Sequence, residues 1–194
     1  MDAAHRIFGL FVLALAAAPS SSMQAPAAPA EVRARMLAGT QCRAPELVLY
    51  SCRFGRAVGS VCASGGTIRY RYGPPGDPEI EIVSASDWSN IFVGAVTGQM
   101  GGHQSHVRFA RGDHHYILFE GVDGAAARNP GREYSGIHVA SGADGARQLA
   151  HLECRGRPIL LGDFTSVLAD HAPPAVRDRG VQVETPGGPF DAWF

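Results

Sequence analysis

The sequence predicts an all-β protein, a small antiparallel barrel or sandwich of about eight strands with a short C-terminal helix and an irregular tail. Between residues 46 and 154, apolar and polar side chains alternate with a period of two, which is typical of strands that bury one face. Glycine-rich turns interrupt this alternation at short intervals. Short strands spaced in this way indicate an antiparallel barrel or sandwich.

Residues 1–30 are expected to form a signal peptide. The apolar run over residues 7–18 has the length of a signal-peptide core and is too short for a transmembrane helix, which needs roughly 20 residues. Ala28-Pro29-Ala30 is the preferred cleavage site. The mature chain is therefore expected in the periplasm or outside the cell, without a transmembrane segment, and residues 31–41 are expected to form a flexible linker.

The β domain is expected over residues 42–154. Its expected strands are 48–54, 58–62, 67–72, one that begins at residue 80, 91–96, 103–110, 114–121, 137–141 and 147–154. Loops are expected at 73–78, where three prolines cannot donate to a strand ladder, and at 122–135. Residues 155–194 form a C-terminal extension with a helix over about 164–170, capped by Asp163 or Thr165.

The chain has four cysteines, Cys42, Cys52, Cys62 and Cys154. Cysteines of an exported protein form structural disulfides because the compartment is oxidising. Zinc ribbons need pairs of cysteines at a much shorter spacing than this chain has. We therefore predict two disulfide bonds, and the sequence leaves all three possible pairings open.

Charge excludes several classes of function. All 17 basic residues are arginine, none is lysine, and the formal net charge is −1. Without an amine, a phosphate-binding P-loop, Schiff-base chemistry and a Ser/Lys dyad are excluded. Nucleic-acid binding is not expected either, because it normally goes with an excess of basic residues.

A surface of arginine and tyrosine side chains is the first candidate binding site, because both residue types are favoured at binding hot spots. Its members lie on neighbouring expected strands and are Tyr50, Arg69, Tyr70, Arg71, Tyr72 and Tyr116. In residues 67–72 the alternation turns Tyr70 toward the core and Arg69 and Arg71 toward solvent. The alternative is that the tyrosines are core residues and the arginines are ordinary exposed strand residues.

Histidines on one expected hairpin are the only candidate metal ligands. If Arg111 and Gly112 form its turn, His106 and His115 are diagonal neighbours about 7–8 Å apart, and Asp113 offers a third ligand. The alternative is that they are solvated histidines without a metal. No G-x-S-x-G motif or carboxylate pair in a groove is evident. We therefore expect no cofactor, no metal and no catalytic residues.

Three stretches resemble a widespread group of uncharacterised exported proteins of Gram-negative bacteria. They are residues 60–64 (SVCAS), 70–73 (YRYG) and 112–116 (GDHHY). This resemblance covers residues 42–154 and implies export and β structure.

The chain also resembles the periplasmic C-type lysozyme inhibitors. Tyr50-Ser51-Cys52 and Cys154 match the family's first strand and the cysteine near the end of its barrel, which implies a Cys52–Cys154 disulfide. Ser84 and Ser86 correspond to a serine-rich binding loop. Asp87 replaces the glycine of that loop, the lysine of the second motif is missing, and the barrel region is longer here.

Together these observations predict an exported, non-enzymatic protein that binds or protects a partner at the cell envelope. That partner is a protein or another envelope component. The alternatives are a lysozyme-inhibitor-like protein and a metal-assisted hydrolase.

Overall fold

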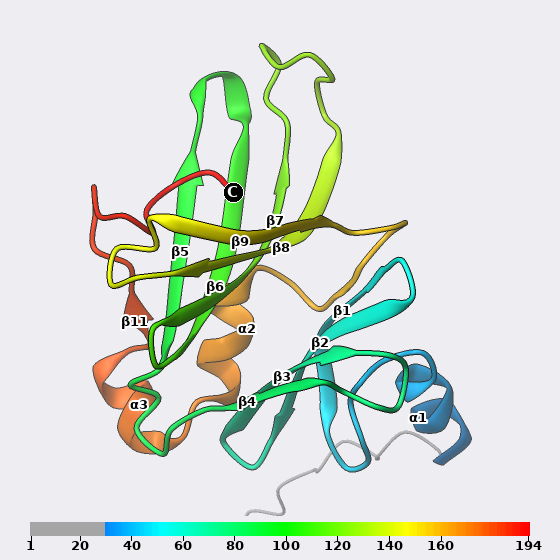
Figure 1. Cartoon of the computed structure of the whole chain (residues 1–194). Helices are drawn as coiled ribbons and strands as arrows, with labels where there is room; N and C mark the ends of the chain where they lie inside the picture. Colours follow the sequence, from blue (N-terminus) through cyan, green and yellow to red (C-terminus); the bar gives the residue numbers. More distant parts are fainter. Residues whose placement is uncertain (1–29) are drawn as a thin grey trace, which may run out of the picture.

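The computed structural model describes residues 30–194 (Figure 1). The expected signal peptide lies outside the described residues, except for Ala30. In the described part of the chain, no helix combines the length and apolar character needed to cross a membrane.

Two sheets make up the fold, as Figure 1 shows, and they form a sandwich rather than a closed barrel. One sheet has five strands in the order β10-β1-β2-β3-β4, and the other has six in the order β11-β5-β6-β7-β8-β9. All neighbouring strands are antiparallel except β11 and β5. The strands are β1 (Leu47–Phe54), β2 (Ala57–Ser64), β3 (Thr67–Gly73), β4 (Ile80–Val83), β5 (Ile91–Thr97), β6 (His103–Arg111), β7 (His114–Val122), β8 (Glu133–Ser141), β9 (Arg147–Glu153), β10 (Ile159–Leu160) and β11 (Gln182–Val183).

The all-β class and the short C-terminal helix are therefore confirmed. The helices are α1 (Ala30–Leu37), α2 (Phe164–His171), α3 (Pro174–Arg179) and the short 3-10 turn η1 (Gln99–Gly101). The Asp163 side chain caps α2, since its Oδ1 accepts a hydrogen bond from the Ser166 N–H at 3.0 Å.

Alternation along the strands builds the core between the two sheets. Tyr70 of β3 stacks on Phe109 of β6 with ring centroids 5.6 Å apart, which joins the sheets through aromatic contact. From α2, Phe164 packs at 5.6 Å from Tyr50, and Leu168 is also completely buried. The C-terminal segment is therefore part of the sandwich, not an extension outside it, because it contributes a core helix and one strand to each sheet.

The expectation of a flexible linker at 31–41 is wrong. Residues 30–37 form α1, and Gln41 is buried against the five-stranded sheet. The Gln41 N–H donates to Ser60 Oγ at 3.0 Å, and its Nε2 donates to the Gly73 carbonyl at 2.9 Å. Polar linker residues are thus held because they satisfy groups on the sheet.

Both predicted disulfides are present. Cys42–Cys62 ties the segment before β1 to β2, with the Cα atoms 5.5 Å apart. Cys52–Cys154 joins β1 of one sheet to the residue after β9 of the other, with the Cα atoms 5.8 Å apart. The second bond thus links the two sheets.

Candidate functional site

The expectation that these arginines and tyrosines form an exposed surface is wrong. Tyr50 and Tyr70 are 0% and 1% exposed, and Tyr72 and Tyr116 pack against the same core. Burial raises the pKa of the Tyr50 and Tyr70 phenols well above the ordinary value, so they stay neutral. The Tyr50 hydroxyl lies 2.9 Å from Ser135 Oγ across the sandwich. These tyrosines are therefore core residues.

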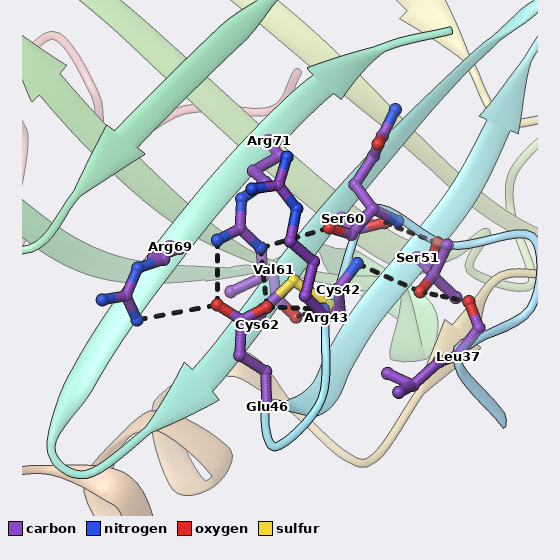
Figure 2. The surroundings of a disulfide bond; sticks show 12 residues. Leu37, Cys42, Arg43, Glu46, Ser51, Ser60, Val61, Cys62, Arg69 and Arg71 are labelled. Atoms are coloured by element: carbon purple, nitrogen blue, oxygen red, sulfur yellow. Dashed lines mark hydrogen bonds and ion pairs between the residues drawn. A yellow bond between two sulfur atoms is a disulfide. The ribbon is translucent and has the colours of Figure 1, made fainter. Parts of the chain in front are cut away.

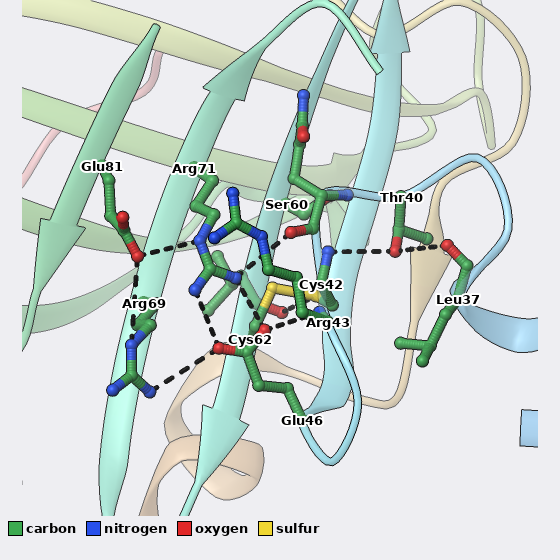
Figure 3. A network of polar contacts seen from close by, with 12 residues as sticks. Leu37, Thr40, Cys42, Arg43, Glu46, Ser60, Cys62, Arg69, Arg71 and Glu81 are labelled. Carbon is green, nitrogen blue, oxygen red and sulfur yellow. Dashed lines mark hydrogen bonds and ion pairs between the residues drawn. A yellow bond between two sulfur atoms is a disulfide. The ribbon is translucent and has the colours of Figure 1, made fainter. Parts of the chain in front are cut away.

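Arg71 faces away from the core as expected but is not solvated. Its guanidinium forms two hydrogen bonds with Glu46, at 2.6 and 2.9 Å, and its Nε donates to Glu81 at 2.9 Å (Figure 3). Arg69 lies 3.6 Å from the same Glu46 carboxylate. The segment before β1 covers this face of the sheet and buries the Arg71 side chain.

The Glu46 network is structural, because every charge in it is paired. Burial opposes ionisation of Glu46, but hydrogen bonds from Arg71 and from the Arg43 N–H outweigh it and lower the pKa of this carboxyl. The network lies beside the Cys42–Cys62 disulfide, as Figure 2 shows. Together they hold the N-terminal segment on the sheet.

Ser84 lies at the end of the β3–β4 pairing, and Ser86 lies in the turn that follows it. The Ser84 hydroxyl accepts a hydrogen bond from the Ile68 N–H at 3.1 Å, and its own N–H donates to the Ile68 carbonyl at 2.8 Å. Ser84 thus continues the pairing of β3 with β4, and only Ser86 is exposed.

The expectation that His106 and His115 are diagonal neighbours is also wrong. Arg111 pairs with His114, so the turn consists of Gly112 and Asp113, and His106 is opposite Phe119. Arg108 therefore lies between the two histidines. Among the described residues, the only group of possible metal ligands within 4.8 Å of one another is Cys42, Glu46 and Cys62. Its two thiols form a disulfide, so it is not a metal site.

Arg108 fixes the C-terminal segment to β6. Its guanidinium carbon lies 3.9 Å from the centre of the Phe92 ring and 4.1 Å from that of Phe190. Two hydrogen bonds of 2.6 and 2.9 Å join it to Glu184, and its Nη1 lies 3.1 Å from His115 Nδ1. This buried charge is fully paired.

Phe119 and Tyr134 lie on the face of the six-stranded sheet opposite to the core residues Leu118 and Ile137, and we call this face the outer face. Phe119 covers Gly136, and a Cβ atom at that glycine would clash with the ring. Tyr134 covers Gly121 in the same way. A glycine opposite each ring therefore lets the ring approach the backbone of the neighbouring strand.

A cavity of about 1030 Å³ opens beside these rings. Phe119, Tyr134, His151 and Phe194 line it. His151 stacks on Phe119 with centroids 5.5 Å apart, and the Tyr134 ring lies 6.3 Å from that of Phe119. Its volume is at the upper end of the range for ligand pockets, roughly 300–1000 Å³.

Polar side chains of both charges complete the lining of this cavity. They include the carboxylates of Asp123, Glu133 and Glu153 and the guanidinium groups of Arg132 and Arg157. Arg132 pairs with Asp123 at 3.0 Å, and Arg157 lies 3.9 Å from Glu133. Hydrogen-bond donors and acceptors therefore occur side by side around the rings.

Sequence reasoning missed this site because it interpreted residues 122–135 as a loop and gave His151, inside the expected strand 147–154, no role. The available signal was the pair of aromatic and glycine positions, Phe119 with Gly121 and Tyr134 with Gly136. That pattern acquires meaning only once the pairing of β7 with β8 is known. We find no family model that matches the chain, and no curated protein or solved structure that is significantly similar to it.

Proposed function

We propose that the protein is an exported, non-catalytic binding protein that holds a neutral glycan of the cell envelope in the cavity beside Phe119. The observation that carries this proposal is the combination of aromatic rings with a polar rim of both charges around one large cavity. Ligand sites typically combine apolar and aromatic walls with a few polar groups that fix orientation.

A sugar ring matches both halves of this lining. Its apolar face can stack on aromatic rings such as those of Tyr134 and His151. Its hydroxyl groups can donate to the carboxylates of Glu133 and Glu153 and accept from the Arg132 guanidinium. Because the volume is at the upper end of the range for ligand pockets, we take a short oligosaccharide rather than a single sugar as the ligand.

Charge argues against a polyanionic ligand. Carboxylates outnumber guanidinium groups in the cavity, and Arg132 and Arg157 each have a carboxylate nearby. A phosphate-rich polymer would need unpaired basic side chains to neutralise it. A neutral ligand needs no such neutralisation.

Export is supported by the apolar run at residues 7–18 and by the two disulfides, which are compatible with an oxidising compartment. We place the protein in the periplasm or outside the cell on these grounds.

Calorimetric titration of the full protein with chitotetraose and with cellotetraose tests this function. Both probes are neutral, and they differ in the acetamido groups. We expect one of them to bind, and His151→Ala to weaken that binding by roughly three- to tenfold through loss of a stacked ring. The control is His114→Ala, because His114 is an exposed histidine at the far end of the β6–β7 hairpin. No heat of binding from either probe, or an equal effect of both variants, contradicts the proposal.

Lysozyme inhibition is the second candidate, because the Cys52–Cys154 disulfide matches the arrangement that this resemblance implies. The serine-rich loop expected for this function has less support, since Ser84 belongs to the pairing of β3 with β4. A lysis assay with a C-type lysozyme tests it, and undiminished lysis at excess protein removes it. We do not carry the metal-assisted hydrolase further, because Arg108 separates His106 from His115.

A further inference from the structure

The C-terminal tail, residues 189–194, crosses the outer face of the six-stranded sheet, as Figure 1 shows in red. Phe190 anchors its start, because the ring packs on the Arg108 guanidinium and lies 4.6 Å from the His115 ring. The end of the tail is bound to Gln104 of β6. The Ala192 carbonyl accepts a hydrogen bond of 3.3 Å from Gln104 Nε2, and the Phe194 N–H donates one of 3.2 Å to Gln104 Oε1.

Three other aromatic rings surround the ring of Phe194. Its centroid lies 5.1 Å from that of His106, 5.3 Å from that of His138 and 6.4 Å from that of Phe119. A second cavity of about 240 Å³ lies against the tail, and Phe194 and His151 line both cavities. Moving the Phe194 ring away from these three rings would therefore remove a wall that the two cavities share.

His106, which contacts the Phe194 ring, is a buried polar residue without hydrogen-bond partners in the described part of the chain. Its side chain is 0% exposed, yet neither Nδ1 nor Nε2 has a hydrogen-bond partner among the described residues. A buried polar group without a partner is costly, and native proteins usually satisfy it. The Phe194 ring meets the His106 ring in a T-shaped contact and offers it no hydrogen bond, while the Cε1–Nε2 edge of His106 lies against Gly94 and near Glu184.

We propose that residues 191–194 are a displaceable plug, and that the glycan site continues beneath it to His106. In the liganded state a sugar ring takes the place of the Phe194 phenyl group, and its hydroxyls satisfy His106. This inference rests on the proposed function for the identity of the ligand. The existence of the plug and of the covered site rests only on the contacts of Phe194 and His106.

The chemistry of the covered site fits a hydroxyl group. Burial and the nearby Arg108 lower the pKa of His106 to about 4, while Asp191 acts in the opposite direction. The imidazole is therefore neutral at pH 7 and offers one donor and one acceptor, as a hydroxyl group does. His138, which lies on the other side of Phe194, has its pKa lowered by burial and by His151.

Histidine modification by diethyl pyrocarbonate, mapped by mass spectrometry at pH 7, tests the plug without any ligand. In the full protein we expect His106 to be protected relative to the exposed His114. Phe194→Ala should raise its rate of modification at least tenfold. Gln104→Ala, which removes both hydrogen bonds of the tail but keeps the ring, is a second variant and should act in the same direction. Val183→Ala, at an exposed site on β11, is the control.

Unchanged protection of His106 in both folded tail variants would overturn the plug. The ligand is tested separately by titration of Phe194→Ala with chitotetraose and cellotetraose. Because no plug then has to be displaced, we expect tighter binding than in the unmodified protein, by about tenfold. Weaker binding would overturn the plug, because the Phe194 ring would then contact the glycan instead of covering its site. Absence of binding in both proteins, with His106 newly reactive, would overturn the glycan and leave the plug standing.

Discussion

Glu46 connects two parts of the chain through one carboxylate. It accepts hydrogen bonds from the Arg71 guanidinium on β3 and from the Arg43 N–H in the segment before β1. Both Arg71 and Glu46 are buried, so each depends on the other to compensate its lost hydration. At the scale of single residues, this pair explains why an arginine on a predicted solvent face is covered.

Replacing Glu46 with alanine should therefore leave Arg71 as a buried charge with fewer partners. We expect a loss of about 3 kcal/mol in the free energy of unfolding, as is typical when one member of a buried pair is removed. The matched control is Glu133→Ala, since Glu133 is exposed and lies 3.9 Å from the exposed Arg157. That change should cost less than about 0.5 kcal/mol. Urea denaturation at pH 7 measures both, and equal losses would argue against a buried pair.

His106 should make stability depend on pH. Its folded pKa of about 4 lies below the ordinary histidine pKa of 6.5, so the unfolded chain binds a proton in that interval and the folded chain does not. The stabilisation is present above pH 6.5 and is lost as the pH falls toward 4. Between pH 7 and 5 the contribution of His106 should fall by about 2 kcal/mol.

The variant His106→Leu isolates this contribution, because the other titrating groups remain. Its free energy of unfolding should fall less between pH 7 and 5 than that of the unmodified protein. Parallel pH profiles of the two proteins in urea denaturation would show that His106 titrates normally. They would thereby contradict its burial beneath Phe194.

Among the elements, the two disulfides close loops of very different length. Cys52 and Cys154 are 102 residues apart, whereas Cys42 and Cys62 are 20 apart. In the chain-entropy account, the longer loop restricts the unfolded chain more. The Cys52–Cys154 bond also joins the two sheets, whereas Cys42–Cys62 secures the segment before β1.

Replacing each cysteine pair with alanine should thus have unequal effects. We expect loss of the Cys52–Cys154 bond to cost about 1.4 kcal/mol more than loss of the Cys42–Cys62 bond. Thermal and urea denaturation of the two double variants measure the difference, and each variant serves as the control for the other. A larger loss on removing Cys42 and Cys62 would mean that the N-terminal segment contributes more than loop length does.

Strand alternation was enough to predict the elements but not their partners. The strands over 48–54, 67–72 and 103–110 were predicted because side-chain periodicity is a local property. The register of the β6–β7 hairpin was missed because its turn uses Gly112 and Asp113, one residue later than expected. The role of 31–41 was missed because Gln41 finds its partners on distant strands, which periodicity does not report.

At the scale of the whole molecule, the candidate site depends on segments that only the complete fold brings together. Phe119, Tyr134 and His151 come from three strands, and Phe194 comes from the tail. Nothing in the local sequence marks these residues as neighbours. The pairing order of β7, β8 and β9 sets the spacing of the rings, and the contact of Phe190 with Arg108 brings the tail across them.

The binding of a neutral glycan on the outer face is most directly tested by nuclear magnetic resonance. Backbone amide shifts of the labelled full protein would be followed during titration with chitotetraose and with cellotetraose. We predict that one probe shifts residues 119–123, 132–135 and 151–157 together with Phe194, and leaves β1–β4 unchanged. Shifts confined to β1–β4, or no shifts with either probe, would contradict the assignment of the cavity beside Phe119 as the glycan site.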